Sequence, residues 1–461
     1  MPPITRRQLL RGASGCAALS STPLLSSLLN LGLVRSVLAD SGPHDGFRAL
    51  VCVFQKGGND SYNMLVPCEP GEYRDYAAAR GILALPREEL LPIRSGGRRF
   101  GIHSAMPEVW ERYMLGDLAF VANVGSLVAP TDRDAYDRRV ELPVGLFSHL
   151  DQRRHWQTSI PQSRAELTGW AGRMADVLTD SVNRNANIPI SYALGGSNIL
   201  QSGRWGGPYV VESAGATTLY GYDGPTSFDR IVTRSTDGLL EQTYGNLLER
   251  AHAAMRRRAI DAAIAYNEAI DGVALASPFP ETPLGAQLQA VTRTIAARDA
   301  LSQSRQIFLV TSHGWDHHDR LRSQQADLLA ELSQALGAFF AATEELGVAD
   351  RVVTFTISDF GRTLTSNRDG SDHAWGGNQL VMGRSVAGCS VHGHYPESLA
   401  PDSALDVGRG RLIPTTSVDE YSAELALWFG IPNDASLELV LPNVRRFYGA
   451  GHSEGPLGFL G

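Results

Sequence analysis

One short segment of the sequence concentrates side chains that bind metals. Within 311–319 the chain places three histidines and two aspartates, namely His313, Asp316, His317, His318 and Asp319. The segment follows an apolar run at 307–310, which predicts a buried strand. Imidazoles and carboxylates are ligands of divalent metals, and open α/β sheets bind ligands at the carboxyl ends of their strands. The spacing therefore predicts a metal site that includes Asp316 and His318, with His313 as a third candidate.

Two further polar clusters follow predicted buried strands. The strand at 49–54 is followed by two glycines and by Asn59, Asp60 and Ser61. Asp60 offers a carboxylate ligand, although an ordinary turn with Asp60 as a helix cap explains the same residues equally well. The strand at 352–357 is followed by Asp359 and Arg362. Asp359 is a candidate ligand, and Arg362 is a candidate two-pronged donor for an anion.

Two clusters outside these strand ends complete the set. Asp372 and His373 lie between glycines, where a turn with a surface histidine is the simpler interpretation. Ser148 and His149 precede a predicted helix. Ser148 is either the cap of that helix, which is the commoner role, or a nucleophile at its amino terminus. His149 is a ligand, a base or a core residue.

These clusters need a scaffold, and the apolar pattern predicts an α/β fold. Continuous apolar strands alternate with amphipathic helices, which indicates a mostly parallel sheet sandwiched by helices. Further strands are predicted at 118–124 and 188–194, and a long helix at about 320–346. Residues 199–235 are rich in Gly, Ser and Thr, and 236–304 has a helical pattern. We therefore expect one domain over 40–461, with a largely helical middle insertion at about 199–304.

The amino terminus predicts export. Residues 5–10, which contain an arginine pair, match a twin-arginine signal, and Ala39 ends a plausible cleavage site. No later stretch reaches the roughly 18 consecutive apolar residues that span a bilayer. We expect removal of 1–39, transport by the twin-arginine export machinery, a periplasmic or extracellular location, and no stable membrane insertion after cleavage.

Composition narrows the class of protein. The chain has 461 residues, 43% hydrophobic content and a net charge of -8, which is typical of a globular protein with a substantial core. The acidic balance argues against nucleic acid as a partner. Cys52 lies inside a predicted strand, and whether Cys68 and Cys389 form a disulfide stays open. The sequence has no Gly-x-Ser-x-Gly elbow, no His-Glu-x-x-His helix and no glycine-rich nucleotide motif, which excludes several common enzyme classes.

Taken in order, five clusters resemble the exported proteins of the bacterial family called domain of unknown function 1501. The resemblance extends from about 47 to 430. That family is similar in fold to the alkaline phosphatase and sulfatase superfamily, whose members hydrolyse phosphate or sulfate esters with one or two divalent metals. The clusters are Gly57-Gly58-Asn59-Asp60, Ser148-His149, Gly314-Trp315-Asp316-His317-His318, Ser358-Asp359-Phe360-Gly361-Arg362 and Ser371-Asp372-His373.

The resemblance implies a role for each cluster. Asp316, His318 and His373 would hold one metal, and Asp60 would be the carboxylate ligand after the first strand. Asp359 would hold a second metal. The cation would be Zn, Mn, Ca or Mg. Supporting positions behind the ligands would be Asn59, Ser61, His149, His313, His317 and Asp372.

The chain also departs from the superfamily. Phosphatases of this type usually have Asp-His where this chain has Asp359-Phe360, and phenylalanine cannot bind a metal. One metal, or a second held by Asp60 and Asp359 near Arg362, fits better than a complete two-metal site. The sulfatase signature Cys/Ser-x-Pro-x-Arg is absent near Ser148, which argues against a formylglycine nucleophile.

Two functions follow from the sequence. The first is a metal-dependent hydrolase of phosphate or sulfate esters, acting on a small molecule or a polymer. In it Ser148 or a water attacks, and Arg362 holds a peripheral oxygen. The second is a non-catalytic binding or assembly protein that keeps the fold with at most one structural metal.

Overall fold

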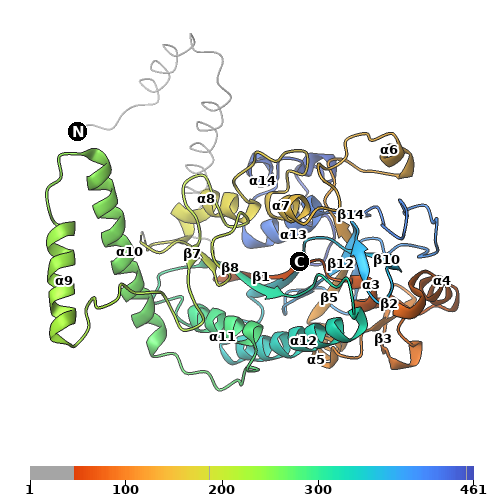
Figure 1. Ribbon diagram of the computed structural model, residues 1–461, viewed down its shortest axis with the longest axis horizontal. Helices are drawn as coiled ribbons and strands as arrows, with labels where there is room; N and C mark the ends of the chain where they lie inside the picture. The colour runs from red at the N-terminus through yellow and green to blue at the C-terminus, as the bar shows by residue number, and fades with distance from the viewer. Residues whose placement is uncertain (1–45, 186, 453, 461) are drawn as a thin grey trace, which may run out of the picture.

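A single large sheet organises the molecule (Figure 1). The computed structural model describes residues 46–460, except 186 and 453. The predicted export signal, 1–39, lies outside the described residues. In spatial order the main strands are β13 (Val391–His392), β5 (Leu118–Gly125), β12 (Gly377–Met382), β9 (Val352–Ser358), β1 (Arg48–Lys56), β8 (Arg305–His313), β6 (Ser191–Ala193) and β7 (Tyr209–Val210).

The predicted mostly parallel sheet is confirmed. β1, β8, β9, β6 and β7 pair in parallel, and β13 and β14 (Thr416–Ser417) each pair in parallel with β5. The exception is β12, which runs antiparallel between β5 and β9. The predicted strand at 188–194 is shorter in the structure, where β6 has three residues.

The central strand β1 explains the continuous apolar run in the sequence. Val51 and Val53 enter the core on one face of the sheet, whereas Leu50 and Cys52 enter it on the other. A strand covered on both faces needs apolar side chains at every position. Its register places Gln55 beside Ser312 of β8 and Ser358 of β9. The loops that follow these three strands therefore leave the same edge of the sheet.

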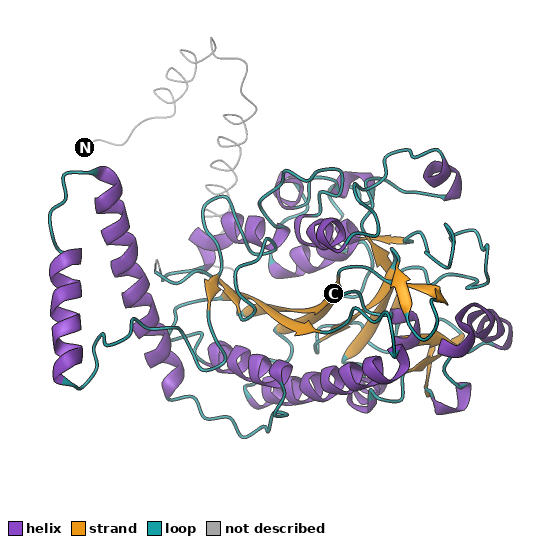
Figure 2. Cartoon of the chain, in the orientation of Figure 1, coloured by secondary structure: helices purple, strands orange, loops and turns teal. Residues whose placement is uncertain are grey.

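Helices cover both faces of the sheet (Figure 2). The strand residues pack against two separate hydrophobic cores, one for each face. On one face lie α5 (Pro107–Leu115), α11 (Pro283–Ala296) and α12 (Leu321–Glu345). On the other lie α7 (His149–Thr158), α8 (Trp170–Val182), α13 (Val418–Phe429) and α14 (Ala435–Val440).

Smaller elements surround the sheet. One three-stranded sheet packs into the first core, and a two-stranded ribbon lies near the end of β9. The strands of these two sheets are β2 (Leu65–Pro67), β3 (Leu91–Ser95), β4 (Arg98–Ile102), β10 (Arg362–Ser366) and β11 (Ser371–His373). Further helices are α3 (Ser61–Met64), α4 (Pro70–Arg80) and α6 (Arg133–Asp137).

The middle of the chain is helical, as the sequence predicted, but its helices differ in their packing. α9 (Ser227–Leu240) and α10 (Leu247–Asp271) form a hairpin that projects from the body, on the left of Figure 1. α9 has no buried residue. By contrast, α11 packs against α12 and contributes Leu288, Val291 and Ile295 to the core. The segment predicted as an insertion therefore contains both a projecting hairpin and a core helix.

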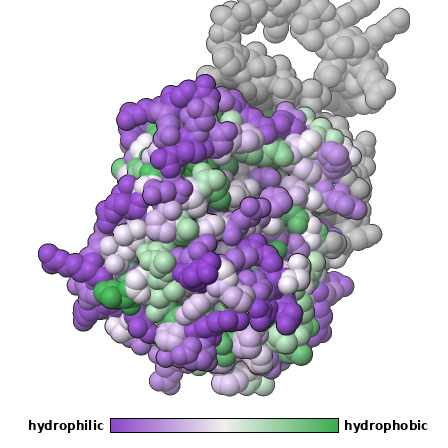
Figure 3. All heavy atoms as spheres, turned by 90° about the vertical axis from the view of Figure 1, so that its right-hand side faces the viewer, coloured by the Kyte–Doolittle hydropathy of each residue, from purple (hydrophilic) through white to green (hydrophobic). Residues whose placement is uncertain are grey.

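The surface on the α4 side of the molecule is mainly hydrophilic, with small scattered hydrophobic spots (Figure 3). Among the helices of the described residues, none combines the length and the apolarity needed to cross a lipid bilayer.

The core on the α12 side of the sheet generates a stability prediction. Phe308 on β8 is fully buried and stacks on Tyr192 at 5.2 Å between ring centroids. Phe308→Ala should lower the free energy of unfolding by about 3–5 kcal/mol, because it removes apolar contacts and leaves a cavity. The same substitution at Phe228, which is 56% exposed on α9, should change it by no more than about 0.5 kcal/mol. Denaturant unfolding of both variants measures the difference, and equal effects would contradict the assignment of this core.

Candidate metal centre

Three imidazoles surround the carboxylate of Asp316, which follows β8. Asp316 Oδ1 lies 3.0 Å from His318 Nε2 and 3.5 Å from His373 Nε2, and Asp316 Oδ2 lies 3.3 Å from His149 Nε2. His149 begins α7, and His373 ends β11. The Asp316 side chain is 45% exposed. The site is therefore open to solvent and assembled from three distant parts of the chain.

The other ring nitrogen of each histidine faces an oxygen of the protein. His149 Nδ1 lies 2.7 Å from Asp359 Oδ2, and His373 Nδ1 lies 2.8 Å from the carbonyl oxygen of Phe147. These two acceptors hold the proton on Nδ1 and leave the Nε2 lone pair directed at Asp316. His318 Nδ1 lies 3.5 Å from Asp372 Oδ1. Carboxylate or carbonyl partners of this kind usually stand behind the histidine ligands of a metal.

Several spacings between donor atoms match those around a tetrahedral cation. Tetrahedral zinc with its usual bond lengths places neighbouring ligand atoms about 3.3 Å apart. His318 Nε2 and His373 Nε2 are 3.1 Å apart, and the three nitrogen-to-Asp316 distances fall on either side of the same value. Each of His149, Asp316 and His373 offers one ligand atom, and these atoms lie within 4.8 Å of one another.

Arg362 holds Asp316 in place from the buried side of the site. Its side chain is completely buried and donates to the carbonyl oxygens of Gly58 at 2.9 Å, Ser371 at 3.0 Å and Gly57 at 2.6 Å. It also pairs with Asp316 Oδ1. Burial acts to raise the pKa of Asp316, but the hydrogen bond and charge of Arg362, together with the nearby imidazoles, lower it overall. The donors of Arg362 are thus directed at the protein's own oxygens, which favours a positioning role over the predicted anion contact.

The glycines after β1 make room for this arrangement. A Cβ atom on Gly57 would meet the backbone nitrogen of Asp316 at 2.5 Å, and its φ of +129° also disfavours any other residue. A Cβ on Gly58 would meet the ring of Phe360 at 2.4 Å. Phe360 packs against the rings of His149 and His373, each at 4.7 Å between centroids. The phenylalanine that departs from the superfamily pattern is therefore an apolar wall of the site.

The predicted ligand Asp60 lies in a separate buried network. Its Oδ2 pairs with Arg80 at 2.5 Å, and both side chains are completely buried. Ser61 Oγ accepts a hydrogen bond from the backbone N–H of Asn378 at 2.7 Å. The backbone N–H of Asn59 donates to the hydroxyl of Ser358 at 2.8 Å. These contacts tie the turn after β1 to β9 and β12.

The remaining predicted residues lie around the centre. Asp359 is buried behind His149, and Asp372 lies behind His318. His317 is buried, and burial lowers its pKa to about 4. His313 is exposed at the end of β8. Ser148 is the N-cap of α7, where its hydroxyl accepts a long hydrogen bond of 3.4 Å from the backbone of Asp151.

The sequence left His149 open as a ligand, a base or a core residue, with a supporting position behind the ligands as a further possibility. The structure brings its Nε2 to 3.3 Å from Asp316 Oδ2. The residue before the Ser-His pair matters as well, because the carbonyl of Phe147 orients His373 and its backbone has a φ of +69°. The signal that could have indicated His149 was its position at the start of a helix that follows a buried strand. Nothing in the apolar periodicity could have indicated a backbone carbonyl.

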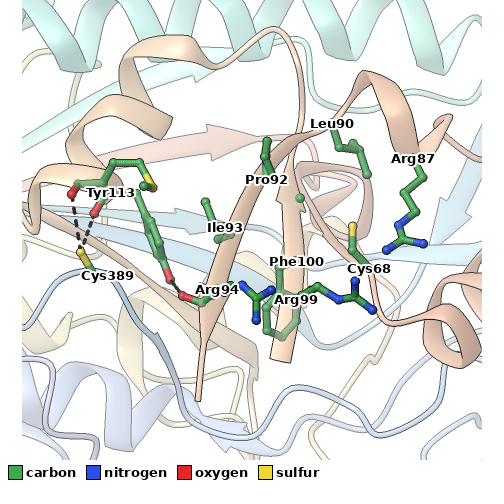
Figure 4. Close-up of a pocket in the computed structure, with 12 residues that line it drawn as sticks. Cys68, Arg87, Leu90, Pro92, Ile93, Arg94, Arg99, Phe100, Tyr113 and Cys389 are labelled. Atoms are coloured by element: carbon green, nitrogen blue, oxygen red, sulfur yellow. Dashed lines mark hydrogen bonds between the residues drawn. The ribbon is translucent and has the colours of Figure 1, made fainter. Parts of the chain in front are cut away.

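The described cysteines are all free thiols, which settles the disulfide left open by the sequence. Cys68 and Cys389 lie at opposite ends of a pocket of about 540 Å³ (Figure 4). The thiol of Cys389 donates to the carbonyl oxygen of Tyr113 at 2.9 Å.

The Asp359–His149 contact generates a prediction about metal affinity. Asp359→Asn should weaken the binding of a divalent metal roughly 10- to 100-fold, because a neutral amide lowers the basicity of the imidazole it orients. Asp350→Asn is the control, since that carboxylate is exposed and lies next to Arg351 on the surface. Competition with a chromogenic chelator measures both affinities. Equal affinities in the two variants would show that Asp359 does not support the centre.

Solved structures with a distant likeness include three bacterial proteins. The C-terminal periplasmic domain of EcEptC from Escherichia coli, in complex with Zn, has 7% identity, a TM-score of 0.31 and 74% coverage of both chains. The lipoteichoic acid synthase LtaP from Listeria monocytogenes has 9% identity and a TM-score of 0.29, with 81% of this chain and 72% of that chain covered. The lipooligosaccharide phosphoethanolamine transferase EptA from Neisseria meningitidis has 9% identity and a TM-score of 0.33, with coverages of 84% and 55%. At these scores, any inference about function has to come from the site itself.

No curated protein matches the sequence. One family profile does match. The region that it matches contains the segments after β8 and β9, but neither Asp60 nor His149. The profile is that of the family described as "Protein of unknown function (DUF1501)", which matches residues 232–406 and confirms the resemblance over that span.

Proposed function

We propose that this protein binds one divalent cation through His149, Asp316, His318 and His373, and that it hydrolyses esters of phosphate or sulfate there. One observation carries the proposal. Three Nε2 atoms converge on one carboxylate, while the Nδ1 atom of each ring faces an oxygen of the protein. A random cluster of surface histidines would not have all three rings oriented in this way.

The donor set selects among the cations that the sequence allowed. Three imidazole nitrogens and one carboxylate suit zinc, whereas calcium and magnesium prefer sites made almost entirely of oxygen. The distances of 3.0–3.5 Å around Asp316 also suit the short bonds of a small tetrahedral ion. Zinc is therefore the proposed cation, ahead of Mn, Ca and Mg.

The residues around the cation have different roles in the proposed reaction. A bound divalent cation would supply a Lewis acid that polarises an ester oxygen. Arg362 holds the Asp316 carboxylate in its ionised form, and Asp359 and the Phe147 carbonyl fix the orientation of two rings. Since Asp316 and His318 are each 45% exposed, a substrate can approach from solvent.

Ser148 is the proposed nucleophile. Its two chain neighbours, Phe147 and His149, both contact the centre, which keeps the backbone of Ser148 close to it. Its capping bond to the Asp151 backbone is long at 3.4 Å, and the amino terminus of α7 favours an anionic form.

One observation supports the alternative function, in which the metal is structural. Three histidines and one aspartate can fill all four positions of a tetrahedral ion, and complete four-ligand sites are usually structural. In that case the protein would be a non-catalytic binding or assembly protein. The two functions differ in whether substrate turnover depends on the centre.

Metal content and turnover separate these functions. Protein purified without chelators should carry about one zinc per chain and hydrolyse a member of a panel of phosphate and sulfate esters. Asp316→Asn should lose the metal and the turnover, because it removes the charged ligand at the centre of the cluster. Asp319→Asn, an exposed carboxylate in the same loop, should retain both. Bound zinc without any turnover would favour the structural alternative, and a chain that takes up no metal would exclude the metal-dependent hydrolase.

Substitutions at Ser148 separate capping from catalysis. Ser148→Asn keeps a good N-cap, so the unfolding midpoint should stay unchanged, while the turnover number falls roughly a thousandfold or more. Ser148→Ala should lose turnover to the same extent and also about 1 kcal/mol of stability. Steady-state kinetics and denaturant unfolding measure both effects. Full turnover in Ser148→Asn would assign the residue to capping alone.

A further inference from the structure

A rigid loop places two arginines next to the metal centre. The loop, residues 406–412, is closed by a bridge between Asp406 and Leu412. The buried carboxylate of Asp406 accepts hydrogen bonds from the backbone of Gly408 at 2.7 Å and of Gly410 at 2.8 Å. Gly410 has a φ of +71°, and a Cβ there would meet Leu364 at 2.4 Å. The conformation of the loop is therefore strongly constrained.

Each arginine of the loop contacts the surroundings of one histidine ligand. Arg411 Nε donates to the carbonyl oxygen of His373 at 3.1 Å, and its guanidinium lies 4.6 Å from the ring centroid of Phe147. Arg409 pairs with Asp372 at 2.6 Å. Both positive side chains are thus attached to the rim of the centre.

The guanidinium of Arg411 differs from that of Arg362 in the N–H groups that remain available to bind a ligand. Arg362 is buried and directs its N–H groups at protein oxygens. Within the described residues, no hydrogen bond engages the terminal nitrogens Nη1 and Nη2 of Arg411. Its Nε contact and its packing on Phe147 fix the plane of the guanidinium, so an anion would meet a preoriented pair of donors.

The charge around the site indicates which anion fits. Only side chains that contact one of the four proposed ligands, or that pair with a carboxylate that does, are counted in the charge of the site. By this criterion three carboxylates balance three guanidiniums, namely Asp316, Asp359, Asp372, Arg362, Arg409 and Arg411. A bound divalent cation would then leave two positive charges. A dianionic group, such as a phosphate monoester, matches this excess, whereas a sulfate monoester carries only one negative charge.

We infer that Arg411 is the anion-binding side chain of this site, and that the group it takes is a dianionic tetrahedral oxyanion of the phosphate monoester class. The inference rests on the proposed metal centre, but not on the proposed hydrolysis. It also assigns to Arg411 the substrate contact that the sequence had given to Arg362.

Two stable analogues test the inference by binding alone. Phenylphosphonate is mainly a dianion at about pH 8.5, and benzenesulfonate is a monoanion with the same aryl group. In calorimetry with the zinc-loaded protein, phenylphosphonate should bind at least about tenfold more tightly. Arg411→Ala should weaken phenylphosphonate binding roughly 10- to 100-fold, because it removes a charge-assisted pair of hydrogen bonds. Arg411→Lys should restore only part of the affinity, since lysine keeps the charge without the fork.

The controls separate a direct contact from a structural effect. Arg384→Ala removes an exposed arginine that pairs with Glu344, and it should bind phenylphosphonate like the wild type. Arg411→Gln keeps a donor for the His373 carbonyl, so it should weaken binding while its zinc content and unfolding midpoint stay normal, even where Arg411→Ala fails to fold.

Three outcomes would overturn the inference: unchanged affinity in Arg411→Gln, equal affinity for the two analogues, or no binding of phenylphosphonate at millimolar concentration. Its failure differs from failure of the proposed function. Binding that depends on Arg411 without turnover of any ester would exclude hydrolysis alone. Ester turnover with binding that is independent of Arg411 would exclude this inference alone.

Discussion

The buried guanidinium of Arg362 is the contact on which the centre depends. It joins the backbone after β1, at Gly57 and Gly58, to the backbone of β11 at Ser371 and to the carboxylate of Asp316. A buried cation without such partners would be strongly unfavourable. These carbonyl oxygens and the Asp316 carboxylate therefore stabilise the buried charge of Arg362. The same contacts hold Asp316 where the three imidazoles meet it.

This dependence explains why the glycines and Phe360 matter. Gly57 lies against the backbone of Asp316, and Phe360 fills the space beside two of the histidines. In a two-metal site the position of Phe360 would carry a ligand. Here it contributes packing, while Asp60, the carboxylate that could have joined a second metal, pairs with Arg80. Among the described residues, the cluster of possible metal ligands is the one that includes Asp316.

Much of the scaffold could be predicted from the sequence because buried parallel strands have continuous apolar runs. β1, β5, β8 and β9 all show this pattern, and the parallel pairing of β1 with β8 and β9 brings the segments after these three strands to one edge. The antiparallel direction of β12 was not predictable, since an apolar run carries no information about strand direction. The contact of Arg411 with the site was not predictable either, because a loop whose path has no periodic signal brings it there. His149, by contrast, was among the candidates that the sequence offered.

The dispersed origin of the ligands has a mechanical consequence. His318 and His373 are separated by 55 positions in the sequence, and His149 comes from a helix on one face of the sheet. A cation held by all of them would cross-link the chain in the way a disulfide does, closing long loops that the unfolded chain would otherwise explore. Removal of the metal by a chelator would then release α7 from the loop after β8 and from β11. The metal would thus be a reversible cross-link between one helix layer and the edge of the sheet.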